Sequence, residues 1–442
     1  MSLSPALRRA ACLLLAAAVA VAQIGAAPKL DGAERRMIAA VAADQARSVA
    51  LLERLVNVNS GTLNLPGVEQ VGRMMRAELE PLGFEVRWVP MAQVERAGHL
   101  IAVHRGTGSG RRMLLIGHLD TVFELDSPFQ RWVRRGTIAE GPGSSDMKGG
   151  LVVMLSALRA MQTAGVLKDA DITIVLTGDE ERVGRPHSVS RADLLAAARA
   201  SDVALEFEGL ADVDGRDYGS ISRRSSSGWT LTVTGRQGHS SRIFSEASGA
   251  GAVFELARIL DEFRRELPEP YLTFNAGLAV GGTTAELDAA GTAGRATGKS
   301  NVIPPVAVAN GDMRTLSQAQ TDRVRAKMQA IVARHLPRTG AEISFRDGYP
   351  AMAPTAESRA LLDRLNGVNR DLGLPEMPEL DPMQRGAGDI AFVAGIVPGL
   401  VGLGAGGQGA HAPGETADLT TLDRQGQRAA LLMYRLSREP RR

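Results

Sequence analysis

The sequence predicts an α/β protein in which a mixed sheet carries helices on both faces and is interrupted by an inserted α+β domain. Short continuous apolar runs, typical of strands buried on both faces, alternate with helical patterns before residue 222 and again after residue 338. Between them, residues 229–234 alternate strictly between apolar and polar side chains, as half-exposed antiparallel strands do. A chain of 442 residues also exceeds the usual size of a single domain, so we expect two domains.

The first 26 residues have the layout of a secretory signal peptide. Arg8 and Arg9 precede an apolar run over residues 10–22, and small residues that suit cleavage lie near Ala22 and Ala27. This run is short for a membrane span. Cys12, the only cysteine, falls inside it, so the mature chain would contain no thiol and no disulfide. We therefore expect a periplasmic or secreted protein with no membrane attachment after cleavage of the signal peptide.

The outer domain, which the inserted domain interrupts, is predicted to span residues 27–222 in its first part. A helix is expected from Lys148 to Ala164, because Leu151, Leu155 and Leu158 recur at helical spacing. The other elements expected here are helical patterns over 44–82, strands at 84–89, 99–104, 113–117, 171–177 and 203–207, and a helix at 192–200.

The inserted domain is predicted to span residues 223–337, with the split ferredoxin-like order β-α-β-β-α-β. Its elements are expected as strands near 229–234, 271–279 and 302–313, with helices at 249–267 and 318–336. The last strand of this order is expected near 341–345, just after that boundary. The second part of the outer domain then covers residues 338–442. It is expected to contain a helix at 357–372, a strand at 399–403 and a closing helix at 422–436.

Histidines and carboxylates follow the predicted strands of the outer domain. His118 and Asp120 end one strand, Glu180 and Glu181 follow the next, and Glu208 follows a third. Ligands in open α/β sheets collect at the carboxyl ends of the strands. Asp146, in a tight loop that opens a helix, and His411, after the last strand, are expected to join them there.

Imidazole and carboxylate without thiolate suit zinc, and also cobalt or manganese. Two Zn²⁺ ions could share Asp146 as a bridge, with His118 and Glu208 on one ion and Glu181 and His411 on the other. Asp120 would accept a hydrogen bond from the second ring nitrogen of His118. Glu206, two residues before Glu208, could compete for its role, but the position of the loop after Phe207 favours Glu208.

Glu180 stands beside a metal ligand and has no metal assigned to it. A carboxylate beside a metal-activated water is suited to act as general base, and it could later protonate a leaving amine. The residues therefore predict hydrolysis of an amide.

These stretches resemble a known family, the co-catalytic zinc peptidases and deacylases, which includes glutamate carboxypeptidases of the carboxypeptidase G type, aminoacylases, and acetylornithine and succinyl-diaminopimelate deacylases. The matching stretches, in the family's order, are "GHLDTV", "GPGSSDMKGG", "TGDEE", "ALEFEG" and "GAHAPGE". The resemblance covers nearly the whole mature chain. Glu208 is followed by Gly209, where relatives often have proline.

The resemblance implies roles for four further residues. His239 in "TGRQGHSS" would stabilise the oxyanion, often from the partner subunit of a homodimer formed through the inserted lid domain. Asn301 and Arg314 would hold the substrate and its carboxylate, and Gly386 in "RGAGDIAF" would line the pocket. The implied activity is a carboxypeptidase that releases a C-terminal amino acid such as glutamate, with aminoacylase-like deacylation of an N-acyl amino acid as the alternative.

Other classes of function fit less well. Without Arg8 and Arg9 the chain has 49 basic and 49 acidic residues, and only 4% of its residues are aromatic, so no nucleic-acid partner is expected. Residues 402–407 match the dinucleotide fingerprint G-x-G-x-x-G, but no helix is expected to follow them. A non-catalytic binding protein is the remaining alternative, and it would leave Glu180 without a purpose.

Overall fold

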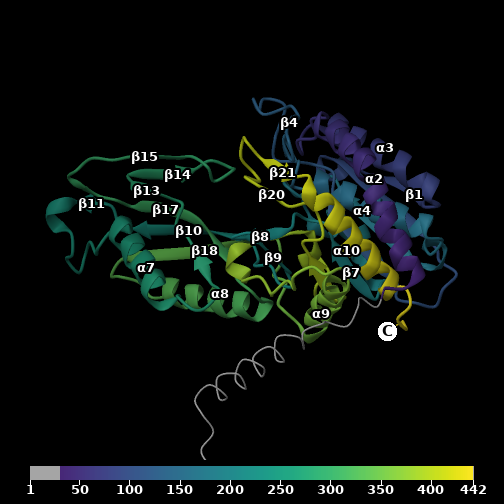
Figure 1. Ribbon diagram of the computed structural model, residues 1–442. Coiled ribbons are helices and arrows are strands. Elements are labelled where there is room, and N and C mark those ends of the chain that lie inside the picture. The colour runs from purple at the N-terminus through teal and green to yellow at the C-terminus, as the bar shows by residue number, and fades with distance from the viewer. Residues whose placement is uncertain (1–29, 442) are drawn as a thin grey trace, which may run out of the picture.

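The computed structural model describes residues 30–441. The predicted signal peptide, residues 1–26, and Cys12 therefore lie outside the described residues. Within residues 30–441, no helix is long and apolar enough to cross a membrane. Two sheets organise this part of the chain, and the smaller one extends away from the larger one with its helices (Figure 1).

The first sheet has six strands in the order β1-β2-β6-β3-β7-β19. Strands β6, β3, β7 and β19 run parallel, whereas β2 pairs antiparallel with both β1 and β6, so the predicted mixed sheet is confirmed. The strands are β1(Glu85–Met91), β2(Arg96–His104), β3(Met113–His118), β6(Ile172–Thr177), β7(Val203–Glu206) and β19(Gly399–Val401). Because β19 comes from the end of the chain, the segment between β7 and β19 leaves this sheet and returns to it.

Side chains from both faces of β3 are buried, as its continuous apolar run predicts. Met113 and Leu115 belong to the core that also contains the apolar residues of three long helices, α2(Gly32–Val56), α4(Lys148–Thr163) and α10(Thr420–Leu436). Leu114 and Ile116 belong to the core on the opposite face, with residues of α6(Ala192–Arg199) and the short 3-10 helix η6(Asp389–Phe392). Helices therefore cover both faces of the sheet.

Smaller elements surround this sheet. The remaining helices of this part are α3(Leu65–Leu79), α5(His187–Ser190) and α9(Ala356–Asp371). A four-stranded sheet is formed by β4(Val133–Arg135), β5(Ile138–Glu140), β20(Gly407–Gln408) and β21(Thr416–Asp418), and a hairpin by β8(Ala211–Val213) and β9(Arg216–Tyr218).

The second sheet is antiparallel and has the order β12-β17-β10-β18, with β13 also paired to β17. Its core is formed by Trp229, Leu231 and Val233 of β10 and the apolar residues of two helices. The elements are β10(Ser227–Gly235), α7(Ala252–Glu266), β12(Thr273–Phe274), β13(Leu278–Gly282), β17(Val306–Arg314), α8(Gln318–Val332) and β18(Thr339–Asp347). Two separate two-stranded sheets accompany it: the hairpin of β14(Thr284–Leu287) and β15(Gly294–Thr297), and the pair β11(Gly238–His239) and β16(Val302–Ile303).

The structure corrects two boundaries that the sequence predicts. The inserted domain was expected to end at residue 337, but β18 pairs with β10 from Thr339 to Asp347, so the second sheet continues to Asp347. The first long helix, expected from residue 44, begins at Gly32, because Asp31 caps its start and exchanges hydrogen bonds with Glu34.

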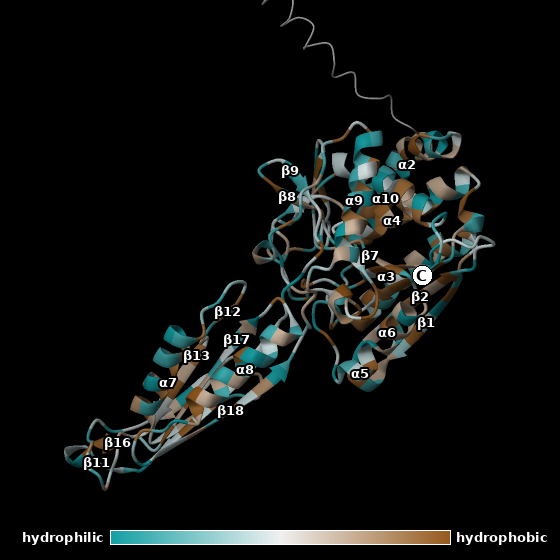
Figure 2. Ribbon diagram, turned by 90° about the horizontal axis from the view of Figure 1, so that it is seen from below, coloured by the Kyte–Doolittle hydropathy of each residue, from teal (hydrophilic) through white to brown (hydrophobic). Residues whose placement is uncertain are grey.

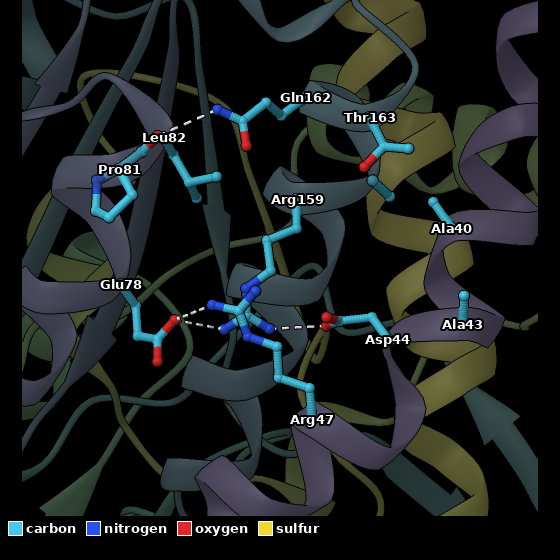
Figure 3. Close-up of a pocket in the computed structure, with 11 residues that line it drawn as sticks. Ala40, Ala43, Asp44, Arg47, Glu78, Pro81, Leu82, Arg159, Gln162 and Thr163 are labelled. Atoms are coloured by element: carbon cyan, nitrogen blue, oxygen red, sulfur yellow. Dashed lines mark hydrogen bonds and ion pairs between the residues drawn. The ribbon is translucent and has the colours of Figure 1, made fainter.

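A buried arginine joins three helices of the first part (Figure 3). Arg159 of α4 pairs with Asp44 of α2 at 2.7 Å and with Glu78 of α3 at 3.0 Å. Its side chain is only 8% exposed, so each carboxylate lies in an environment where an unpaired charge would be costly. The hollow around these residues has a volume of about 340 Å³ and contains none of the predicted site residues.

Candidate metal centre

The ends of three neighbouring strands bring the predicted ligands to one edge of the first sheet. His118 is the last residue of β3, Glu181 follows β6, and Glu208 follows β7. Strands β6, β3 and β7 are adjacent and parallel, so their carboxyl ends meet there. Asp146 comes from the loop before α4, and His411 from the loop between β20 and β21.

Asp146 lies between two groups of ligand atoms. One of its carboxylate oxygens is 3.2 Å from His118 Nε2, which is 3.6 Å from the carboxylate of Glu208. Its other oxygen is 3.0 Å from His411 Nε2, which is 3.2 Å from the carboxylate of Glu181. Each group has its ligand atoms within 4.8 Å of one another. The structure therefore brings together the two ligand sets that the sequence predicts, with Asp146 common to both.

Asp120 contacts His118 and the backbone of the segment that contains Glu180 and Glu181. The Nδ1 atom of His118 lies 3.1 Å from the carbonyl oxygen of Asp120 and 3.4 Å from its carboxylate. A proton on Nδ1 therefore has acceptors, which leaves Nε2 free to bind a metal. The Asp120 carboxylate also accepts hydrogen bonds from the backbone nitrogens of Glu180 and Glu181, at 3.0 and 3.1 Å, and from the hydroxyl of Thr62.

The carboxylate of Glu180 lies near the cluster but outside both groups that contain Asp146. It forms a further candidate group with His118 and Glu181, with ligand atoms within 4.8 Å of one another. Burial raises the pKa of Glu180 well above its usual value, and the negative charges of Glu181 and Glu208 raise it further, against the opposing effect of His118. Glu180 is therefore a carboxyl group that can hold a proton at the edge of the metal cluster.

The electrostatics of the cluster fit two bound cations. Contacts with Asp146 and Glu181 raise the pKa of His411 to about 11, and burial raises the pKa of Glu181 to about 7. Burial lowers the pKa of His118, but its contacts with Asp120 and Asp146 outweigh this effect, so its pKa is raised. Without a metal, protons on the histidines and on Glu181 would thus compensate the negative charge of the cluster. Bound divalent ions could take the place of these protons. The donors are imidazole nitrogens and carboxylate oxygens, which suit zinc, cobalt or manganese.

Glu206 belongs to none of the candidate ligand groups within residues 30–441. Its carboxylate pairs with Arg223 at 2.8 Å and accepts a hydrogen bond from the backbone nitrogen of Ile390 at 2.8 Å. Glu208, rather than Glu206, contacts His118. Arg223 also lies 3.6 Å from Glu208, so one guanidinium lies beside both carboxylates and compensates their charge.

A cavity of about 360 Å³ opens beside the cluster. Asp146, Glu180, Glu208 and His411 line it together with Gly386, one of the residues expected to contact substrate. Arg314 of β17 reaches the same region, since a methyl group added at Gly386 would lie 4.0 Å from its Nη1 atom.

His239 and Asn301 are not brought to the cluster within this chain. His239 belongs to β11, which pairs with β16, and the carbonyl oxygen of Asn301 accepts a hydrogen bond from the backbone nitrogen of Ser240. Both side chains are exposed. Figures 1 and 2 place β11 at the far end of the second sheet, away from the first.

Glu415 and Tyr349, for which the sequence predicts no role, hold the site in place. Glu415 accepts hydrogen bonds from the backbone nitrogens of Gly143, Ser145 and Asp146, at 3.0, 2.8 and 2.9 Å. Tyr349 donates its hydroxyl proton to the carbonyl oxygen of Glu180. Glu415 ends the quoted stretch "GAHAPGE", which was a signal for it, whereas no pattern marks Tyr349.

Known proteins resemble this chain in sequence. The sequence model of peptidase family M20/M25/M40 matches residues 114–436. Carboxypeptidase G2 from Pseudomonas sp. (strain RS-16) is 26% identical over 444 residues, which cover 98% of this chain and 99% of that protein. A succinyl-diaminopimelate desuccinylase from Novosphingobium aromaticivorans is 33% identical over 205 residues, which cover 43% of this chain and 51% of that protein.

Solved structures resemble it in fold. A tripeptidase from Staphylococcus aureus superposes with a TM-score of 0.68 at 16% identity, covering 89% of this chain and 99% of that one. A dinuclear metal-binding peptidase from Bacillus subtilis superposes with a TM-score of 0.63 at 17% identity, covering 89% of this chain and 98% of that one. At these identities the likeness supports the fold alone.

Proposed function

This chain belongs to peptidase family M20/M25/M40, and on that premise we propose that it is an exported dinuclear zinc hydrolase that cleaves an amide or peptide bond next to a free carboxylate. In its most specific form, the proposal is a carboxypeptidase that releases a C-terminal amino acid such as glutamate. The full-length similarity to carboxypeptidase G2 supports it. The observation that carries it is the position of Asp146 between two histidine and carboxylate groups, with Glu180 beside them.

The metals would be held by the two groups that share Asp146. His118 and Glu208 would complete one site, and Glu181 and His411 the other. Divalent ions bound there would lower the pKa of a water molecule toward about 7 and polarise a carbonyl oxygen.

Glu180 would move the proton. Its carboxylate would take a proton from the attacking water and return it to the nitrogen of the leaving amine. Asp120 and Tyr349 hold the backbone on the two sides of Glu180, through its N–H and its carbonyl oxygen respectively. Such fixing matters because small displacements of a catalytic group lower the rate steeply.

Arg314 would bind the free carboxylate of the leaving amino acid. Its guanidinium lies near Gly386, which lines the cavity that the candidate metal ligands also line. Guanidinium groups pair with carboxylates through two parallel hydrogen bonds. The similarity to desuccinylases favours a second candidate function, deacylation of an N-acyl amino acid, in which the same carboxylate would be bound.

His239 and Asn301 would act from a second subunit. Both are exposed at the far end of the second sheet, so a homodimer formed through this lid domain would let them reach the partner's site. Mixing His239→Ala and Glu180→Ala proteins, each inactive alone, should then restore part of the activity. Absence of any recovery in the mixed, re-associated sample would contradict action across the dimer.

A substrate panel tests the proposed activity. Zinc-loaded protein should release glutamate from a dipeptide or from an N-acyl glutamate, and a chelator should abolish the release. Glu180→Gln preserves the shape of the side chain but cannot accept the proton, so it should retain the metals and lose turnover by at least about 100-fold. Unchanged turnover in Glu180→Gln would remove the assigned base.

A further inference from the structure

A second and larger cavity borders the segment that contains Glu180 and Glu181. It has a volume of about 660 Å³ and is lined by residues that include Glu181 and Tyr349. Glu180 lines the cavity beside the candidate metal cluster, and the next residue, Glu181, lines this one, so both cavities border the same segment of the chain. A substrate whose scissile bond lies at Glu180 could therefore extend into the second cavity.

Positive charge predominates in the lining of this cavity. Arg96, Arg182, Arg185 and Arg346 line it, against the carboxylates of Glu95 and Glu181. Glu181 is already engaged by His411 at 3.2 Å. Within residues 30–441, none of the four guanidinium groups forms an ion pair. Asp347, next to Arg346 in the chain, is paired with Arg325 at 2.6 Å instead. The positive charge in this cavity is therefore largely uncompensated.

Backbone contacts hold two of these arginines in place without neutralising them. Arg96 donates from Nε to the carbonyl oxygen of Arg182 at 2.7 Å and from Nη1 to that of Glu95 at 2.9 Å. Arg185 donates from Nη2 to the carbonyl oxygen of Asp347 at 2.5 Å. Burial and the positive charge of Arg346 lower the pKa of Arg185, against the opposing effect of Asp347, so part of the shift reflects repulsion between like charges. An anion bound between them would relieve that repulsion.

We propose that this cavity is a subsite for the acyl side of the substrate and that it selects an acyl group ending in a carboxylate. The inference rests on the proposed function and deepens it. Arg314 would bind the carboxylate of the leaving amino acid, and the arginine-lined cavity would bind a second carboxylate on the other side of the scissile bond. Guanidinium groups fit this role because their donors match the two oxygens of a carboxylate. The substrate class is thus an N-acyl amino acid, or a peptide, with an acidic acyl part.

Two matched substrates test the subsite. N-succinyl-L-glutamate and N-succinamoyl-L-glutamate have the same shape, but the second carries an amide in place of the terminal carboxylate. We expect the wild-type protein to cleave the succinyl substrate with a kcat/KM about tenfold or more higher, because hydrogen bonds to charged groups contribute that much. Equal kcat/KM values for the two substrates would overturn the proposal.

Substitution of the two arginines without a hydrogen-bonded partner locates the effect. In Arg182→Gln/Arg346→Gln we expect kcat/KM for the succinyl substrate to fall about tenfold or more, and that for the succinamoyl substrate to stay within about twofold. Arg199→Gln, which removes an exposed charge of α6 outside the cavity, should change neither value. An equal fall for both substrates in the double variant would mean a structural role and would overturn the proposal.

Direct binding separates this inference from the proposed function. If neither substrate is cleaved, the panel of dipeptides and other N-acyl glutamates decides whether the proposed hydrolysis fails, and calorimetric titration of the full chain with succinate and succinamate tests the cavity alone. Both compounds carry a carboxylate that could bind a metal, so only the second carboxylate distinguishes them. Tighter binding of succinate that is lost in Arg182→Gln/Arg346→Gln would support an anion-selective cavity. The same affinity for both compounds would refute it.

Discussion

Replacement of Glu415 by glutamine should weaken metal binding, although Glu415 contacts no predicted metal position. The side chain is only 1% exposed. One carboxylate oxygen accepts hydrogen bonds from the backbone nitrogens of Ser145 and Asp146 and from the Ser145 hydroxyl, and the other accepts one from the backbone nitrogen of Gly143. These bonds fix the loop that presents Asp146.

The magnitude follows from the geometry of the substituted amide. In Glu415→Gln the amide oxygen can keep three of the hydrogen bonds, but the NH₂ group then faces the N–H of Gly143. Two buried donors that face each other cost about 1–3 kcal/mol. The loop can relieve this cost by moving, which displaces Asp146 from both groups of ligands. Disturbing the residues that orient metal ligands typically lowers metal affinity by about 10–100-fold, and we expect that range here.

Competition with a chromophoric chelator measures the effect. Zinc affinity should fall by about 10–100-fold in Glu415→Gln, while Asp288→Asn should leave it unchanged. Asp288 is a suitable control because it also accepts backbone hydrogen bonds, from Thr292 and Ala293, but in the exposed hairpin of the second sheet. A folded Glu415→Gln protein with wild-type zinc affinity would mean that Glu415 does not position Asp146 for metal binding.

Three further predictions follow from the charges and contacts of the described residues. Contacts with Asp146 and Glu181 raise the pKa of His411 to about 11, so its ring is an imidazolium at pH 7, and the pKa of His118 is raised as well. Zinc binding should therefore release protons, measurable by calorimetry in buffers of different ionisation enthalpy; no release would contradict the contacts of these rings with carboxylates. Arg159→Met should lower the free energy of unfolding by about 2 kcal/mol in urea titrations, because the largely buried carboxylates of Asp44 and Glu78 lose a partner. No change would mean that solvent already compensates the charge of these two carboxylates. Glu208→Gln should lower the zinc content, whereas Glu206→Gln should keep it at the wild-type value, and the reverse result would exchange the roles of these two glutamates.

Much of the metal cluster could be predicted because its residues end strands. His118, Glu181 and Glu208 each follow a buried apolar run, and parallel strands of one sheet must bring such residues together. Asp146 and His411 come from loops, so their placement depended on the order of motifs along the chain rather than on periodicity.

Other features depend on contacts between distant segments and left no pattern in the sequence. The hairpin β14–β15 was not predicted, because the glycine-rich residues around it do not alternate clearly. The arginine-lined cavity joins Arg96, Arg182 and Arg346 from three separate stretches, and each of them alone reads as an ordinary surface charge. The position of His239 far from the cluster likewise follows from the pairing of β11 with β16.

Metal stoichiometry tests whether Asp146 joins two metal sites. Protein loaded with zinc and freed of excess metal should contain close to two equivalents by atomic emission. His411→Ala should lower this value toward one equivalent, because only one group contains His411, whereas Asp146→Ala should lower it toward zero. One equivalent in the wild-type protein, or two equivalents in folded Asp146→Ala, would contradict a dinuclear centre bridged by this residue.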